Sequence, residues 1–146
     1  MPTVALRFSP LAEHVRTARL VAVAVARRAG FPESQLDEIR IAIGEACARA
    51  VLRTRSDAFV SMDLTDDHDR LDVVVHDDRR DVVDGPVGGA GGSEDPLALA
   101  LMAGMAEAVS VDDEDGAPGA VRMTWSLHAE PSDAPSPRGD GGASGS

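Results

Sequence analysis

The stretch LDEIRIAIGEACARAVLR, residues 36–53, decides the fold. Apolar residues recur in it at steps of three and four, which predicts an amphipathic helix with one face in the core. That face consists of Leu36, Ile39, Ile43, Ala46 and Ala50. Glu45 and Arg49 stand one turn apart, in the order that favours an i, i+4 ion pair. We expect both of them, with Glu38 and Arg53, to lie away from the core.

The sequence before this helix predicts a strand and another helix. Residues 3–8 (TVALRF) alternate between two faces, which is typical of a short strand. A helix over 10–29 follows, with Ser9 as its N-cap, Pro10 at its first position and Gly30 at its end. In the second helix, Ser34 and the Asp three residues later resemble a capping box.

The sequence after residue 53 predicts four more strands and a third helix. The strands are expected at residues 59–64, 71–75, 109–111 and 121–127. Asp95 and Pro96 open a helix that runs to about residue 108, and the aperiodic stretch 77–94 is long for a loop. This order predicts an α/β two-layer sandwich, with a mostly antiparallel sheet and three helices on one face.

Composition limits the function classes. The chain has a formal net charge of −11, which repels a phosphate backbone, so we expect no nucleic-acid binding. Cys47 is the only cysteine and is expected to be a small buried side chain, and the histidines lack ligand spacing, so we expect no metal site. No signal peptide or membrane-spanning run is visible, which favours a cytoplasmic protein without a membrane partner.

The chain is expected to divide into a domain and a tail. Residues 129–146 (AEPSDAPSPRGDGGASGS) lack any large apolar side chain. Such a segment buries too little surface to offset its conformational entropy, which predicts a disordered C-terminal tail. Residues 1–128 are then left for one folded domain.

Two motifs in this order of elements resemble a known family. They are GEACARAV in the second helix and LDVVVHDD in the third strand. The chain is similar to the serine-kinase anti-sigma factors of the RsbW type, within the GHKL superfamily of histidine-kinase-like ATPases, over about residues 3–128. The resemblance implies a GHKL (Bergerat-like) ATPase fold and partner switching with a sigma factor or a STAS-type anti-anti-sigma factor. Such proteins often pair as homodimers.

The resemblance assigns roles within the second helix. In the family motif Glu-Ala-x-x-Asn-Ala, the glutamate is the general base towards a serine of the antagonist and the asparagine holds magnesium. Here the glutamate is Glu45 and the asparagine position is Arg49. Arginine has no acceptor atom and a fixed positive charge, so it cannot ligate Mg²⁺. We expect Arg49 to pair with Glu45 instead.

The other nucleotide motifs also depart from the family pattern. Asp77 matches the aspartate that accepts the adenine amino group, but Arg79 and Asp81 occupy positions where glycines let the backbone approach the nucleotide. Pro96 and Ala98 occupy the glycine positions at the start of the third helix. Proline has no N–H to offer a phosphate, and side chains at the other positions crowd the pocket.

One family feature on the first helix is kept. The segment Ala18-Arg19-Leu20-Val21 fits a family segment whose arginine contacts the sigma factor. Arg16 lies one turn earlier, at the border of the same apolar stripe. We expect Arg16, Arg19 and the loop 78–94 to bind partners, although a solvated arginine at a helix border is the alternative reading of either side chain.

Three hypotheses follow from these residues. The first is an anti-sigma-factor-like binding protein of partner switching, without cofactor or catalytic activity, because each nucleotide motif is altered. The second is an active ATP-dependent protein serine kinase that phosphorylates its STAS antagonist, with ATP and Mg²⁺, Glu45 as base and Asp77 as adenine ligand. The third is an unrelated α/β domain in which Glu45 and Arg49 form a surface ion pair worth ~0.3–0.5 kcal/mol.

Overall fold

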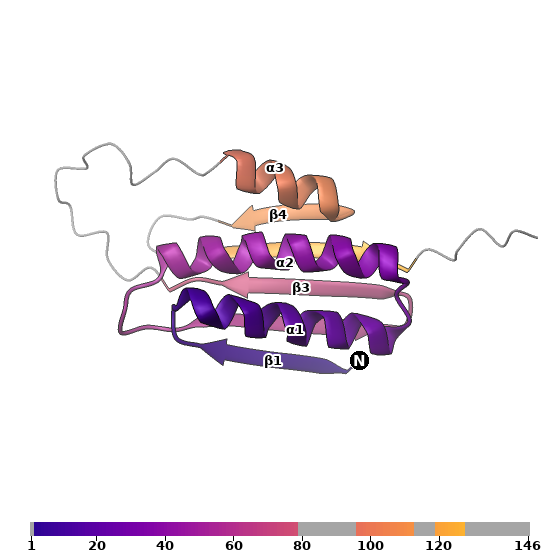
Figure 1. The fold of residues 1–146 in the computed structure, drawn as a ribbon, viewed down its shortest axis with the longest axis horizontal. Coiled ribbons are helices and arrows are strands. Elements are labelled where there is room, and N and C mark those ends of the chain that lie inside the picture. Colours follow the sequence, from indigo (N-terminus) through magenta and orange to yellow (C-terminus); the bar gives the residue numbers. More distant parts are fainter. Residues whose placement is uncertain (1, 79–95, 113–118, 128–146) are drawn as a thin grey trace, which may run out of the picture.

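The computed structural model of the protein describes residues 2–78, 96–112 and 119–127. Its elements follow the order that the sequence predicts (Figure 1). They are β1 (Thr3–Phe8), α1 (Ala12–Ala29), α2 (Glu33–Arg53), β2 (Val60–Asp67), β3 (Arg70–His76), α3 (Pro96–Met105), β4 (Ala108–Asp112) and β5 (Ala120–Ser126). The predicted tail, residues 129–146, lies outside the described residues, as does most of the loop 78–94.

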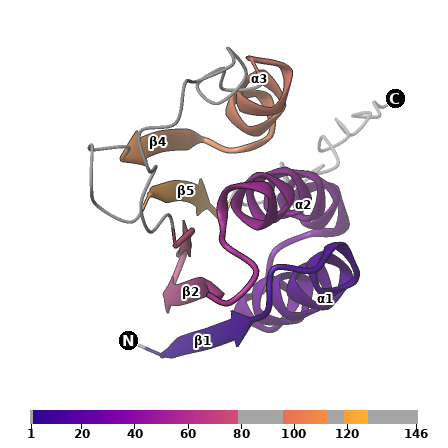
Figure 2. The ribbon, with the colours of Figure 1, turned by 90° about the vertical axis from the view of Figure 1, so that its left-hand side faces the viewer.

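The strands form one five-stranded sheet in the order β1-β2-β3-β5-β4, and all neighbours are antiparallel. The three helices lie on one face of this sheet (Figure 2). The predicted two-layer α/β sandwich is therefore confirmed. None of the helices in the described ranges combines the length and the apolar composition that a membrane span requires.

The core lies between the helices, chiefly α1 and α2, and the three central strands. Alternate residues of β2, β3 and β5 point at the helices and are almost fully buried, because strand side chains change face at every residue. The strand register aligns them across the sheet, with Met62 opposite Val75 and Val73 opposite Met123. Trp125 completes this layer, and its indole N–H donates a 2.8 Å hydrogen bond to the backbone oxygen of Met105, which joins the end of α3 to β5.

The start of α1 differs from the prediction. The helix begins at Ala12 with Leu11 as N-cap, and no side chain caps it. The backbone oxygen of Ser9 accepts a hydrogen bond from the N–H of Leu11 at 2.7 Å and contacts Nδ1 of His14 at 3.0 Å. Because these contacts fold Ser9 and Pro10 into a turn of their own, both residues precede the helix. The predicted end is correct, since Gly30 adopts φ 100° and donates back to the last turn.

The start of α2 also differs from the prediction. The helix begins at Glu33, with Pro32 as N-cap and without a side-chain cap, so the predicted capping box of Ser34 is wrong. The backbone oxygen of Pro32 already accepts from the N–H of Leu36 at 3.0 Å, which closes the first turn and places Ser34 inside it. The third helix is shorter than predicted, because the residues after 107 join the sheet as β4.

Cys47 lies on α2 and is buried, as predicted. Burial raises the pKa of its thiol to about 12, because the thiolate would lose its hydration, and the nearby charge of Arg19 offsets part of this rise. A thiol that stays protonated and inaccessible is a structural group and not a nucleophile.

Candidate functional site

The carboxylate of Asp77 lies at the end of β3 and is engaged through both of its oxygens. Oδ1 accepts a hydrogen bond from the backbone N–H of Gly119 at 3.0 Å, and Oδ2 accepts one from Nε of Arg53 at 3.2 Å. The N–H of Asp77 in turn donates to the backbone oxygen of Gly119 at 3.0 Å. A Cβ added at Gly119 would lie 2.6 Å from Oδ2, so only glycine allows this approach.

Arg53 reaches Asp77 from the last turn of α2. The side chain of Asp77 is 2% exposed and that of Arg53 is 17% exposed, so the ion pair is largely removed from water. Beside it, the backbone N–H of Asp78 donates to Oγ1 of Thr54 at 3.1 Å. The end of α2 and the end of β3 are thus joined by charge and by hydrogen bonds. The prediction that Arg53 lies away from the interior is wrong.

Arg49 lies one turn before Arg53 on α2 and is buried, with 9% of its surface exposed. Glu45 is half-buried, and the ion pairs among the described residues do not include one between Glu45 and Arg49. The predicted pair is therefore absent. An exposed i, i+4 pair is worth only ~0.3–0.5 kcal/mol, so its absence costs little stability.

The remaining motif positions are only partly described. Pro96 is the exposed first residue of α3, and Ala98 is buried two positions later. Arg79 and Asp81 lie outside the described residues. In the described ranges, no three His, Cys, Asp or Glu residues are placed to hold a metal ion.

The two arginines expected to bind partners lie on α1. Arg16 is exposed, while Arg19 is half-buried because it crosses α2 at Gly44. A Cβ added at Gly44 would lie 3.1 Å from Cδ of Arg19, so this glycine makes room for the arginine stem. No described carboxylate forms an ion pair with Arg16 or Arg19. The two side chains therefore present positive charge on the helical face of an acidic protein.

Comparison with known proteins agrees with this fold. The sequence pattern of the histidine kinase-like ATPase domain matches residues 8–125. This chain belongs to the histidine kinase-like ATPase family. A search of curated proteins finds no similar sequence.

One solved structure shows the same fold as this family member. It is the crystal structure of the RsbU and RsbW domains of Rv1364c from Mycobacterium tuberculosis, with a TM-score of 0.68 and 15% sequence identity. The match covers 87% of this chain and 32% of that chain, so this chain spans about a third of its length. At this identity the likeness shows a shared fold.

The resemblance directed attention to Glu45, Arg49 and Asp77, but sequence reasoning missed the contact of Arg53 with Asp77. Arg53 follows Arg49 by four residues, so the two share a face of α2. That spacing was a visible signal, but periodicity alone placed both arginines on the outer side of the helix. The contact with Asp77 joins residues 24 positions apart, and no local pattern reports such a contact.

Proposed function

We propose that this protein is an anti-sigma-factor-like regulator that binds a sigma factor, a STAS-type anti-anti-sigma factor or both, and that it does so by partner exchange without ATP. The observation that carries this proposal is the buried pair of Arg53 and Asp77. In the resemblance, Asp77 is the carboxylate that receives the adenine amino group. Here an arginine of the same chain donates to it.

The energies favour the internal pair over adenine. Removing one partner of a buried ion pair costs about 3–5 kcal/mol, because the other charge stays buried and uncompensated. A hydrogen bond from a neutral amino group to a carboxylate contributes about 1.5–3 kcal/mol. Adenine therefore cannot displace Arg53 by this contact alone. Arg49 adds to the argument, because a guanidinium offers no lone pair to Mg²⁺.

The surface proposed for partners is the side of α1 that carries Arg16 and Arg19. Their guanidinium groups have no carboxylate partner among the described residues, so they are available to carboxylates of another protein. Partners of these two classes act in the cytoplasm, and we place this protein there with them.

The second candidate is an active protein serine kinase, and one observation favours it. Glu45 is half-buried on α2 and forms no ion pair with a described residue, so its carboxylate is open to a serine hydroxyl. Transfer of a phosphoryl group also needs a metal and cationic clamps on the phosphates. With Arg49 in place of the magnesium ligand, the metal lacks that side chain.

Calorimetric titration with ATP and Mg²⁺ tests the nucleotide part. We expect no binding by the natural protein or by Arg49→Asn, because Arg53 still holds Asp77 in both. The double variant Arg49→Asn, Arg53→Ala shows whether the arginine pair alone blocks the site. Tight, magnesium-dependent binding by the natural protein contradicts the proposal and favours the kinase.

Titration with the sigma factors and STAS proteins of the source cell tests the partner part. We expect Arg16→Ala and Arg19→Ala each to weaken the cognate complex about tenfold, which is 1.4 kcal/mol and typical of a lost charged contact. Arg28→Ala is the matched control, since Arg28 is an exposed arginine in the last turn of the same helix. Transfer of labelled phosphate to the STAS protein, abolished by Glu45→Gln, would establish the kinase instead.

A further inference from the structure

Strand β1 is an edge strand whose outer backbone groups are unused within the described residues. The N–H of Asp66 donates to the backbone oxygen of Pro2 at 3.1 Å, which makes these two a hydrogen-bonded pair. Hydrogen-bonded pairs alternate along an antiparallel ladder, so even-numbered residues of β1 point their backbone groups at β2. The N–H and C=O groups of Thr3, Ala5 and Arg7 therefore point outwards, away from the sheet.

The side chains of β1 agree with this assignment. Oγ1 of Thr3 lies 3.3 Å from Oγ1 of Thr65 across the ladder, as expected where a non-hydrogen-bonded pair brings side chains close. Val4 and Leu6 are half-buried on the face that α1 covers, although β1 is at the edge. An exposed edge strand with apolar side chains is a template for pairing with another chain.

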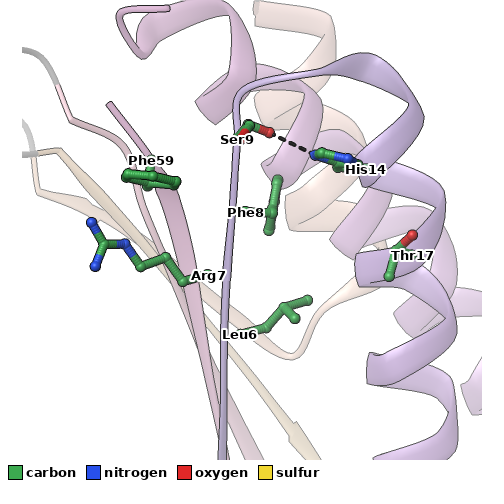
Figure 3. Close-up of a pocket in the computed structure, with 7 residues that line it drawn as sticks. All are labelled: Leu6, Arg7, Phe8, Ser9, His14, Thr17 and Phe59. Atoms are coloured by element: carbon green, nitrogen blue, oxygen red, sulfur yellow. Dashed lines mark hydrogen bonds between the residues drawn. The ribbon is translucent and has the colours of Figure 1, made fainter. Parts of the chain in front are cut away.

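A cavity of about 430 Å³ opens beside this edge, between the end of β1 and the start of α1 (Figure 3). Leu6, Phe8, His14 and Thr17 line it on the α1 side of the strand, and Arg7 and Phe59 line it from the other side. The rings of Phe8 and His14 meet edge to face at 6.2 Å, and Nδ1 of His14 contacts the backbone oxygen of Ser9 at 3.0 Å. These contacts fix the wall of the cavity before any ligand arrives.

Arg7 lies on the opposite side of the strand, over the ring of Phe59 (Figure 3). Its guanidinium carbon is 4.1 Å from the ring centroid, a cation–π contact that orients the charge without neutralising it. No described carboxylate forms an ion pair with Arg7. The cavity thus runs along the edge strand, with apolar side chains on one face of the strand and an oriented positive charge on the other.

We propose that β1 binds an extended segment of a partner protein as an added strand, and that this segment alternates apolar and acidic residues. Successive side chains of a strand point to opposite faces. A bound segment that places an apolar side chain in the cavity therefore places its neighbour on the side of Arg7, where a carboxylate is favoured. The outward backbone groups of Thr3, Ala5 and Arg7 supply the ladder.

A second copy of β1 is a poorer occupant than such a segment. The strand reads TVALRF and contains no acidic residue. Pairing two copies around a two-fold axis at Ala5 places Arg7 opposite Thr3 of the other copy, so the charge gains no carboxylate.

None of the residues used here belongs to the Asp77 site, and this proposal therefore does not depend on whether the protein binds ATP.

The probe for the test is a fluorescein-labelled octapeptide in which leucine and glutamate alternate, titrated by fluorescence polarisation. Because its sequence repeats every two residues, this peptide presents the same side chains in every register that shifts by two residues along β1. We expect binding that is lost when lysine replaces glutamate, because of Arg7, and when alanine replaces leucine, because of the cavity. Hydrogen exchange should show that the peptide protects the amides of Thr3, Ala5 and Arg7.

Variants of the edge identify the site. Ala5→Pro removes one outward N–H while keeping the hydrogen bonds to β2. We expect it to weaken binding about tenfold, because one hydrogen bond to the added strand is lost and the adjacent ones are disturbed. Ala5→Val is the matched control, because it keeps the N–H and should keep the affinity. Arg7→Glu reverses the charge of an exposed side chain and removes its contact with the Phe59 ring. It should weaken binding about tenfold as well, which keeps the test decisive if the proline variant does not fold.

Three results would overturn the proposal. The first is no binding of the leucine–glutamate peptide at millimolar concentration. The second is unchanged affinity in Ala5→Pro and Arg7→Glu. The third is protection of the Ala5 amide that rises with protein concentration in the absence of peptide, because this would make the edge an interface between two copies.

Discussion

The end of α2 and the outer side of α1 both carry arginines, but the arginines are used differently. Arg53 is held by the buried carboxylate of Asp77, whereas Arg16 and Arg19 meet no carboxylate among the described residues. The first arrangement uses a charge to join a helix to a strand end. The second leaves charge at the surface. The contrast teaches that arginines of one acidic protein can serve in a buried contact between a helix and a strand end, as Arg53 does, or leave their charge at the helical surface, as Arg16 and Arg19 do.

The largest effect is expected at the buried pair. Arg53→Ala removes the guanidinium from the buried carboxylate of Asp77, which keeps its hydrogen bond from the N–H of Gly119. We expect the free energy of unfolding to fall by about 3 kcal/mol, because an uncompensated buried charge is costly. Urea denaturation at pH 7 measures this loss.

Arg40→Ala is the matched control for that variant. Arg40 lies on the same helix and pairs with Asp37 at 3.2 Å, but both side chains are about half exposed or more. An exposed pair contributes about 0–1 kcal/mol, so the control should change stability little. Equal losses in Arg53→Ala and Arg40→Ala would show that the Asp77 contact is no more structural than a surface pair.

Alanine substitutions at two glycines, one beside Asp77 and one on α3, are expected to change the stability in opposite directions. Gly119→Ala forces a methyl group to within 2.6 Å of Oδ2 of Asp77, and we expect a loss of about 2 kcal/mol from the displaced carboxylate. Gly104→Ala on α3 meets nothing within 4 Å and should gain about 0.5–1 kcal/mol, because alanine is the better helix former. Thermal unfolding of the two variants measures both shifts. A gain in Gly119→Ala would contradict the close packing at the strand end.

The burial of the Cys47 thiol on α2 can be tested through the pH dependence of the stability. Burial raises the pKa of its thiol from 9.0 to about 12, so between these values the unfolded chain ionises while the folded protein does not. The stabilisation by this group is therefore complete below pH 9 and is lost as the pH rises towards 12, by about 1.4 kcal/mol per pH unit. Cys47→Ala lacks this dependence, so the stability difference between the two proteins should change between pH 9 and 10. A constant difference would mean that the thiol is accessible.

Most of the fold follows from local patterns in the sequence. Val60, Met62 and Leu64 alternate on one face of β2, and the helical steps of Leu36, Ile39 and Ile43 define the inner face of α2. These periods of two and about 3.6 report which side of an element is buried. The element order and the layer architecture were therefore predictable before any contact was known.

Helix starts and the site itself were less predictable. Ser9 and Ser34 have the chemistry of caps, but competing backbone bonds at Ser9 and Pro32 place the helix starts elsewhere. The site depends on contacts between distant segments, such as Arg53 with Asp77 and Gly119 with Asp77. Residue periodicity carries no information on which distant carboxylate an arginine will meet.

The smallest effect is expected on α1, and it tests the other half of the comparison. Arg16→Ala removes an exposed side chain without an ion pair to a described residue, so we expect the free energy of unfolding to change by less than about 0.5 kcal/mol. Arg19→Ala should cost slightly more, because its stem packs over Gly44. Urea denaturation of both variants, beside Arg53→Ala, measures the difference. If Arg16→Ala destabilises the protein as much as Arg53→Ala does, the surface arginines are structural too, and α1 loses its claim to be the partner surface.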